Sequence, residues 1–333
     1  MITTSPEKLV RLMNECGALN KPFVFAVDFE MTEGLFSDEP FTDPDIFFTV
    51  HGRGSQRKRP FPVESALFSS YPCPYDEYLE KFMVVRNGLL RGDSFLVNLT
   101  VKTPIQCSLS LEDIFTLSDA PYTLFVPGRF ACFSPETFVK MAGNSISTYP
   151  MKGTIGAEIP GAADIILNDF KESAEHATIV DLLRNDLSIL SDDVEVSRYR
   201  YIDHLVTSER EILQVSSEIK GTLRPGWQGE IGDILFSMLP AGSCSGAPKA
   251  STLRIIERAE REPRGFYTGI FGLFDGRSLD SGVLIRFIEI DGDDMFFRSG
   301  GGITAYSKPH DEYLEASEKI YLPFARALRQ KVS

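Results

Sequence analysis

STYPMKGTIG (147–156) and ILNDFKESAEHATIVDLLRNDLS (166–188) gather several reactive side chains in a short part of the chain. The first segment presents Lys152 in a tight, turn-forming context. The second predicts a helix over about 165–187 that carries Glu175 and His176 toward the Arg-Asn-Asp sequence at 184–186. Strand-like sequence lies on both sides of this stretch, so we expect the chain to fold around it as one intertwined α+β domain.

Composition and charge narrow the class of protein. Hydrophobic residues make up 43% and charged residues 24% of the 333 residues, which is typical of a soluble globular protein. The 34 Lys and Arg residues against 47 Asp and Glu residues give a formal net charge of −13. This balance argues against a nucleic-acid or anionic-membrane binder. A small anionic substrate would need cations gathered locally at its site.

Cysteine usage and hydropathy predict the compartment. The cysteines lack CxxC and Cys/His spacing, which is the pattern of a reduced protein rather than of a disulfide framework or zinc site; they lie at positions 16, 73, 107, 132 and 244. The N-terminal MITTSPEKLVRLMNECG has no apolar signal-peptide region, and no later run of about 18 apolar residues exists. We therefore expect a cytoplasmic protein without a membrane span.

Periodicity and turn signals predict mixed helices and strands. Helices are expected over 5–16, 75–91, 110–117, 165–187, 229–239, 247–260 and 311–330. Strands are expected over 22–30, 93–105, within 122–143, and over 198–208 and 211–225. Residues 31–62 are interpreted as loop-rich, with a solvated basic hairpin loop at 52–60. Segments 265–276, 281–292 and 294–306 are predicted to form a three-strand antiparallel meander.

Three glutamates are candidates for acid–base or metal chemistry. Glu136 lies at the edge of an apolar strand, where burial would raise its pKa and keep it protonated as a general acid; a solvated turn residue is the alternative. Glu175 and Glu315 lie in different helices, and two such carboxylates with water and substrate oxygens can hold Mg²⁺. The alternative for Glu315 is a surface ion pair with Lys319, worth about 0.3–0.5 kcal/mol.

Glycines and one arginine are candidates for binding an anion. Gly300-Gly301-Gly302 follows one strand and precedes another, unlike the nucleotide-binding glycine motifs, and its N–H groups could approach a carboxylate. A β-bulge is the alternative. Gly242 and Gly246 could act similarly at the start of the 247–260 helix. Arg286 lies alone in an apolar strand, where its burial is costly unless it meets an anion.

Two patterns offer competing interpretations. Gly-Ser-Cys-Ser-Gly at 242–246 has the shape of a nucleophile elbow, and His310-Asp311-Glu312 follows, which together imitate a Cys244-dependent glutamine amidohydrolase. Pro240 interrupts the strand that such an elbow requires, and alternating βα units are missing from the pattern. Lys220 lies in a second Lys-Gly-Thr sequence, and the residue chemistry alone does not choose between Lys152 and Lys220.

Taken together and in order, nine motifs resemble those of the chorismate-utilising enzymes, which include anthranilate synthase component I, aminodeoxychorismate synthase component I and the isochorismate and salicylate synthases. The motifs are SPE (134–136), PMKGT (150–154), AEH (174–176), DLLRND (181–186), LPAGSCSGAPK (239–249), PRGFYTG (263–269), IRF (285–287), SGGGI (299–303) and EYLEASEK (312–319). The resemblance implies an α+β fold of antiparallel or mixed sheets around a central cleft with helices outside. It implies that 121–333 is the chorismate-binding catalytic region and 1–120 a shortened, divergent amino-terminal part of the same fold.

The lysine of the PMKGT motif makes the resemblance closest to aminodeoxychorismate synthase component I, because anthranilate synthases carry alanine there. The family pattern selects Lys152 over Lys220. It implies that Lys152 attacks C2 of chorismate while Glu136 protonates the departing C4 hydroxyl, after which ammonia adds at C4. It implies Mg²⁺ on Glu175 and Glu315. The substrate-binding positions that it implies are Thr154, His176, Tyr267, Arg286, Gly300, Gly301, Gly302 and Lys319.

The resemblance also implies a source of ammonia and a product. No glutaminase segment is recognised in the sequence, so ammonia is expected from a separate glutamine amidotransferase subunit or from solution. The product would be 4-amino-4-deoxychorismate, on the branch leading to p-aminobenzoate and folate. Anthranilate or isochorismate synthesis is the alternative within the family. The family's Arg-Pro-Arg-Gly after KGT is replaced by Ile-Gly-Ala-Glu at 155–158, and RNDLGR becomes RNDLSI at 184–189. The loss of these arginines is expected to affect loop closure and partner docking more than the chemistry.

Overall fold

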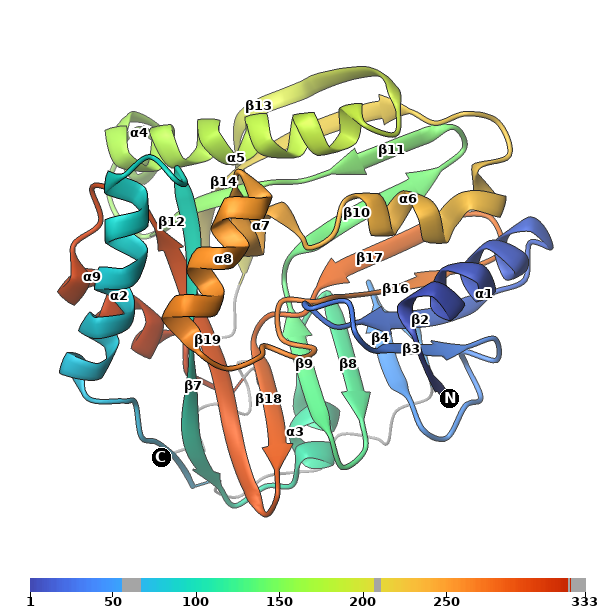
Figure 1. Ribbon diagram of the computed structural model, residues 1–333, viewed down its shortest axis with the longest axis horizontal. Helices are drawn as coiled ribbons and strands as arrows, with labels where there is room; N and C mark the ends of the chain where they lie inside the picture. Colours follow the sequence, from blue (N-terminus) through green and yellow to red (C-terminus); the bar gives the residue numbers. More distant parts are fainter. Residues whose placement is uncertain (56–66, 207–210, 323, 325–333) are drawn as a thin grey trace.

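Two large antiparallel sheets with helices outside them make up the molecule (Figure 1). The computed structural model describes residues 1–55, 67–206, 211–322 and 324. The helices are α1 (Pro6–Ala18), α2 (Tyr75–Leu90), α3 (Leu111–Leu117), α4 (Ala162–Asn168), α5 (Phe170–Ser188), α6 (Ile231–Ser237), α7 (Gly242–Ser245), α8 (Lys249–Glu260) and α9 (Pro309–Glu318), with a 3-10 turn η1 (Trp227–Glu230). In the described ranges, no helix combines the length and apolar character needed to cross a membrane.

The first sheet joins the beginning of the chain to a part near its end. Its order is β1 (Ile2–Thr4), β3 (Gly34–Ser37), β2 (Phe23–Val27), β16 (Ile270–Phe274), β17 (Leu279–Val283), β10 (Thr137–Ala142), β11 (Ser145–Thr148), β14 (Glu211–Thr222) and β12 (Met151–Gly156), and β13 (Asp192–Val206) also pairs with β14. β2 pairs with β16, and all five of its residues are buried.

The second sheet contains the three glycines noted in the sequence. Its order is β15 (Gly246–Ala247), β7 (Leu96–Cys107), β19 (Asp294–Ile303), β18 (Phe287–Asp291), β9 (Phe130–Ser134), β8 (Tyr122–Val126), β4 (Phe47–Val50) and β5 (Arg53–Gly54), and β6 (Phe68–Ser70) also pairs with β7. Gly300, Gly301 and Gly302 pair with Thr100, Leu99 and Asn98 of β7.

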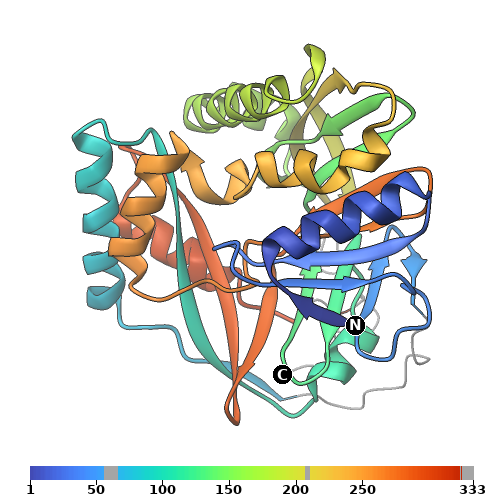
Figure 2. The same ribbon diagram turned by 45° about the vertical axis from the view of Figure 1, so that its right-hand side comes forward.

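The core lies between the sheets and beneath the helices. Val24 and Phe271 of the first sheet share a buried cluster with Leu124 and Phe130 of the second. Another cluster joins α1 and α6 to the first sheet, and a third joins α2, α8 and α9 to β7 and β19, where these helices lie together (Figure 2). The predicted α+β class with helices outside is confirmed.

The predicted three-strand meander over 265–306 is wrong. β16 and β17 form a hairpin in the first sheet, whereas β18 and β19 form a hairpin in the second. The segment expected as one strand, 281–292, is broken at Arg286, whose φ of 55° lies in the left-handed region. Arg286 therefore does not lie inside an apolar strand but at the bend where the chain passes from one sheet to the other.

Three other elements differ from the sequence prediction. The helix expected over 165–187 is α4 followed by α5, because the Asp169 side chain accepts a hydrogen bond from Glu172 N at 2.8 Å and caps a new helix. Residues 31–55 include β3, β4 and β5; the remainder of the basic segment, 56–60, lies outside the described residues. α9 ends at Glu318, consistent with the helix-disfavouring effect of a proline at 323 on the residues before it. Residues 325–330 of the predicted helix lie outside the described ranges.

Candidate active site

A bulge in β12 aims Lys152 at helix α5. Gly153 has a φ of 78°, and the register of β12 against β14 shifts between Lys152 and Thr154. Only glycine adopts this conformation at little cost, and the extra residue turns the strand locally. Lys152 Nζ lies 3.4 Å from Oε2 of Glu175, and the lysine side chain is 24% exposed. Thr154 lies on the exposed side of the bulge.

The β19 glycines lie between Lys152 and helix α9. A Cβ atom placed on Gly302 would be 3.1 Å from Lys152 Nζ. One placed on Gly301 would be 3.6 Å from Glu312 Oε2 and 3.8 Å from Glu315 Oε1. Because successive residues of a strand face opposite sides of the sheet, Gly302 leaves room beside Lys152 and Gly301 leaves room beside the α9 carboxylates.

Helix α9 brings acidic groups and a lysine next to Gly300 and Gly301. Lys319 Nζ donates hydrogen bonds to Glu315 Oε1 at 2.7 Å and to the Gly300 carbonyl oxygen at 2.8 Å. The ion pair considered as the alternative for Glu315 is thus formed, and the Glu315 side chain is 53% exposed. Glu312 is buried and was not predicted; its signal was its position three residues before Glu315 on one helix face.

The carboxylates offer the hard oxygen donors that Mg²⁺ prefers. Glu175 of α5 contacts the Lys152 ammonium group, whereas Glu315 of α9 contacts that of Lys319 and lies 3.8 Å from a Cβ placed on Gly301. Within the described ranges, no group of three or more His, Cys, Asp or Glu side chains is close enough to hold a metal ion by itself. Substrate and water oxygens would have to complete any coordination sphere.

Glu136 lies in the turn between β9 and β10. Its Oε1 accepts a hydrogen bond from the Ser243 hydroxyl at 2.5 Å. Burial raises the pKa of Glu136, while the Ser243 hydrogen bond and the charges of Lys152 and Arg286 oppose the rise. The raised pKa is what a proton donor requires. Sequence reasoning missed Ser243, although it had noted the glycines on either side of it.

His176 is a neutral buried group. Its Nε2 lies 2.7 Å from the Ser217 hydroxyl on β14. Burial, together with the positive charges of Arg200 and Lys152, lowers the pKa of His176 to about 4. At neutral pH it therefore adds no positive charge, and it contacts the sheet through a hydrogen bond.

Arg286 and Tyr267 lie close to the Glu136 side of the site. The left-handed bend leaves Arg286 half-buried, with Nε donating to the Tyr321 hydroxyl at 3.2 Å. Tyr267 is buried, and its ring centroid lies 5.9 Å from that of Phe287. The charge of Arg286 lowers the pKa values of both Glu136 and Tyr267, although burial of each group outweighs it.

The residues of the two competing interpretations are Cys244 with His310, and Lys220. Cys244 is buried in the short helix α7, and burial with the nearby Glu136 raises its pKa to about 12, the opposite of an activated nucleophile. His310 packs against the Tyr75 ring, with centroids 5.6 Å apart. Lys220 is 43% exposed on β14 and pairs with Glu218 at 3.1 Å. Neither Cys244 nor Lys220 has the environment of a reactive group.

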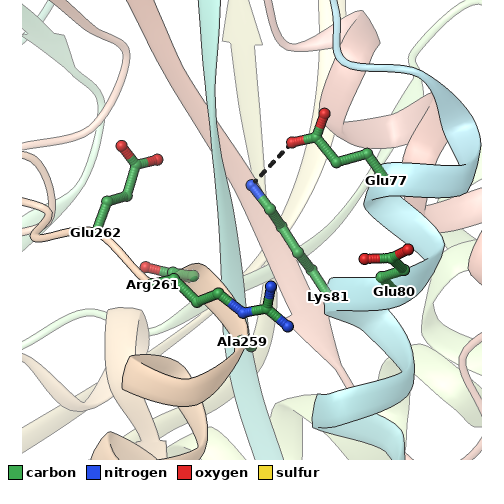
Figure 3. Close-up of a pocket in the computed structure, with 7 residues that line it drawn as sticks. Glu77, Glu80, Lys81, Ala259, Arg261 and Glu262 are labelled. Atoms are coloured by element: carbon green, nitrogen blue, oxygen red, sulfur yellow. Dashed lines mark ion pairs between the residues drawn. The ribbon is translucent and has the colours of Figure 1, made fainter.

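A cavity borders this site. A cavity of about 500 Å³ lies against Glu175, with mostly apolar walls from α5, the start of β7 and the segment after β19. A second cavity of about 350 Å³ lies between α2 and the end of α8, and Lys81 points in it toward Glu77 (Figure 3). The second contains none of the predicted site residues; its walls are Glu77, Glu80, Lys81, Ala259, Glu260, Arg261 and Glu262.

Gly302→Ala is expected to impair catalysis more than stability. Its Cβ would lie 3.1 Å from Lys152 Nζ, so the lysine amine must shift by a few tenths of an ångström from its position beside Glu175. We expect turnover to fall about tenfold or more, because small displacements of reacting groups are costly. Steady-state kinetics and thermal melting check this, and wild-type turnover would contradict it.

Comparison with known proteins identifies the family and the fold. The family model for chorismate binding enzymes matches residues 53–324. An "Uncharacterized PabA-like protein" of Haemophilus influenzae is 46% identical over 98% of this chain and 100% of its own length. Aminodeoxychorismate synthase component 1 of Bacillus subtilis is 30% identical over 79% of this chain and 58% of its own length. The solved structure of MenF, the menaquinone-specific isochorismate synthase from Escherichia coli, shares the fold with a TM-score of 0.73 at 15% identity, over 94% of this chain and 80% of that one. The chain belongs to the family of chorismate binding enzymes.

Proposed function

We propose that this enzyme aminates chorismate at C4 to give 4-amino-4-deoxychorismate, with ammonia supplied by a glutamine amidotransferase subunit. The observation that carries the proposal is the position of Lys152, whose amine lies beside Glu175 and over Gly302. The similarity to an aminodeoxychorismate synthase component supports the same assignment. In this proposal, residues 121–333 provide the catalytic groups, and 1–120 are a shortened amino-terminal part of one fold.

Two covalent steps account for the amination. The Lys152 amine forms a bond to C2 of chorismate, the ring double bonds shift, and the C4 hydroxyl departs as water with a proton from Glu136. Ammonia then adds at C4, the double bonds shift back, and the lysine leaves C2 as the neutral amine. The ammonium group formed at C4 returns a proton to the Glu136 carboxylate. Attack requires the neutral amine. Because Glu175 pairs with Lys152 in this structure, that carboxylate must turn to another cation before the lysine can react.

The remaining residues would bind and orient an anionic substrate. Glu175 and Glu315 would hold Mg²⁺, which when bound offsets the negative charge of the chorismate ring carboxylate. Arg286 and Lys319 supply positive charge within a chain of net charge −13. Neutral His176, Tyr267, Thr154 and the N–H groups of Gly300–Gly302 would complete the contacts with polar groups that carry no charge.

Product identification tests the function directly. The purified chain is incubated with chorismate, Mg²⁺ and ammonium without a partner, and the products are separated by HPLC. We expect 4-amino-4-deoxychorismate. Anthranilate or isochorismate as the product would contradict the proposal and favour another reaction of the family. Addition of glutamine and a candidate glutaminase subunit then tests whether ammonia is delivered by a partner.

Glu136→Gln is expected to reduce turnover by about 10²–10⁴-fold, because an amide cannot donate the proton that C4 needs. Burial raises the pKa of Glu136, so in the wild type the active protonated form is present below that pKa and is lost as pH rises through it. The alkaline limb of kcat should therefore disappear in the variant. Measurements at constant free ammonia check this, and an unchanged alkaline limb would exclude Glu136 as the proton donor.

A further inference from the structure

The Gly-Ser-Cys-Ser-Gly segment at 242–246 presents one side chain to the proton donor. Gly242, Cys244 and Ser245 are buried, whereas Ser243 is only partly buried and its hydroxyl donates to Glu136 Oε1 at 2.5 Å. On the basis of the function proposed above, we propose that Ser243 is a positioning residue for Glu136. It fixes the orientation of the carboxyl group and stabilises the carboxylate that remains after proton transfer.

The hydrogen bond decides which carboxyl oxygen carries the proton. In a protonated carboxyl group, one oxygen accepts hydrogen bonds and the other bears the hydrogen. With the Ser243 hydroxyl donating to Oε1, we infer that the proton of neutral Glu136 lies on Oε2. Oε2 is therefore the oxygen that protonates the departing hydroxyl.

The same hydrogen bond becomes stronger as the reaction proceeds. When Glu136 gives up its proton, negative charge spreads over both oxygens, and hydrogen bonds to charged acceptors are roughly twice as strong as those between neutral groups. Ser243 thus stabilises the charge that develops in the transition state more than it stabilises the starting state. An interaction of this kind raises kcat rather than the affinity for substrate.

Other motif residues hold the serine in place. Lys249 Nζ lies 2.9 Å from Asp186 Oδ2 of α5 and donates to the Met238 carbonyl oxygen at 2.6 Å. These contacts join the residues before and after the 242–246 segment. Arg264 Nη1 donates to the Cys244 carbonyl oxygen at 2.8 Å. The DLLRND and GAPK motifs, to which the reaction assigns no chemistry, thereby fix the position of the hydroxyl.

Ser243→Ala and Ser243→Thr form the test pair. We expect the alanine variant to lose about 10- to 100-fold in kcat with little change in KM for chorismate, because a hydrogen bond to a charged group is lost. Its alkaline limb should move to higher pH, because the Ser243 hydrogen bond lowers the pKa of Glu136. The threonine variant keeps the hydroxyl and should restore both properties. Free ammonia is held constant across the pH series.

The outcomes separate this proposal from the proposed function. A wild-type kcat and an unchanged alkaline limb in Ser243→Ala would overturn the positioning role of Ser243. An equal loss of kcat in the alanine and threonine variants would also overturn it, because the loss would then come from altered packing and not from the missing hydroxyl. Adding Ser243→Ala to Glu136→Gln should cost little further activity; losses that multiply would show that Ser243 does not act through Glu136. Wild-type activity in Glu136→Gln alone would instead overturn the proposed role of Glu136, before any serine variant is made.

Discussion

Lys152→Ala is expected to abolish formation of 4-amino-4-deoxychorismate, with a loss on the order of 10³-fold or more, because the variant lacks the nucleophile of the covalent step. Lys220→Ala is the matched control, since it removes the lysine of the other Lys-Gly-Thr sequence. That lysine pairs with Glu218 on the surface, so its loss should leave turnover near the wild-type value. HPLC of the products from chorismate, Mg²⁺ and ammonium measures both.

A direct test of the covalent step accompanies the kinetics. Intact-protein mass spectrometry of quenched reactions should show an adduct with the mass of chorismate less water on the wild-type enzyme and on Lys220→Ala, but not on Lys152→Ala. An active Lys152→Ala together with an inactive Lys220→Ala would reverse the assignment of the two lysines. An anthranilate-like product from Lys152→Ala would indicate that this residue selects the product.

Arg264→Leu is expected to destabilise the protein by about 3–5 kcal/mol, because it leaves the buried Glu260 carboxylate without its cation. Arg264 is 1% exposed and donates to both carboxylate oxygens of Glu260, at 2.8 and 2.6 Å. It also donates to the Asn98 carbonyl oxygen on β7, at 2.7 Å. One side chain therefore joins helix α8, the second sheet and the segment that carries Ser243.

Urea unfolding followed by the fluorescence of Trp227, the single tryptophan, measures the loss. Lys220→Leu breaks an exposed ion pair and should cost no more than about 1 kcal/mol. Arg264→Leu combined with Glu260→Leu should be less destabilising than Arg264→Leu alone, because no unpaired charge is then buried. A stability of Arg264→Leu within about 1 kcal/mol of the wild type would contradict this account of the pair.

Elements with local signals could be predicted from the sequence. α1 begins at the Ser5 cap and α3 at the Ser110–Asp113 capping box, both within one or two residues of the expected start. The misassigned strands arose where tertiary contacts decide. The bend at Arg286 splits one apolar run between two sheets, and nothing in that run signals a left-handed residue. The pairing of β2 with β16 joins segments that no local pattern connects.

The residues of the candidate site were likewise predicted only in part. Lys152 and Glu175 were identified through motifs close together in the sequence, and the structure places their side chains in contact. Glu312 and Ser243 were missed, because a glutamate on a helix and a serine in a loop are common on protein surfaces. Only the packing of α9 and α7 against the sheets shows that Glu312 lies beside Gly301 and Ser243 beside Glu136.

The pairing of β2 with β16 has a consequence for the newly made chain. The apolar strand Phe23–Val27 leaves the ribosome about 240 residues before its partner Ile270–Phe274 exists. At about 5–20 residues per second, it waits roughly 12–50 s for the edge that it will cover. The amino-terminal strands therefore complete their sheet only when synthesis is nearly over. Until then the unpaired apolar strand can associate with other nascent chains, which binding to a chaperone would prevent.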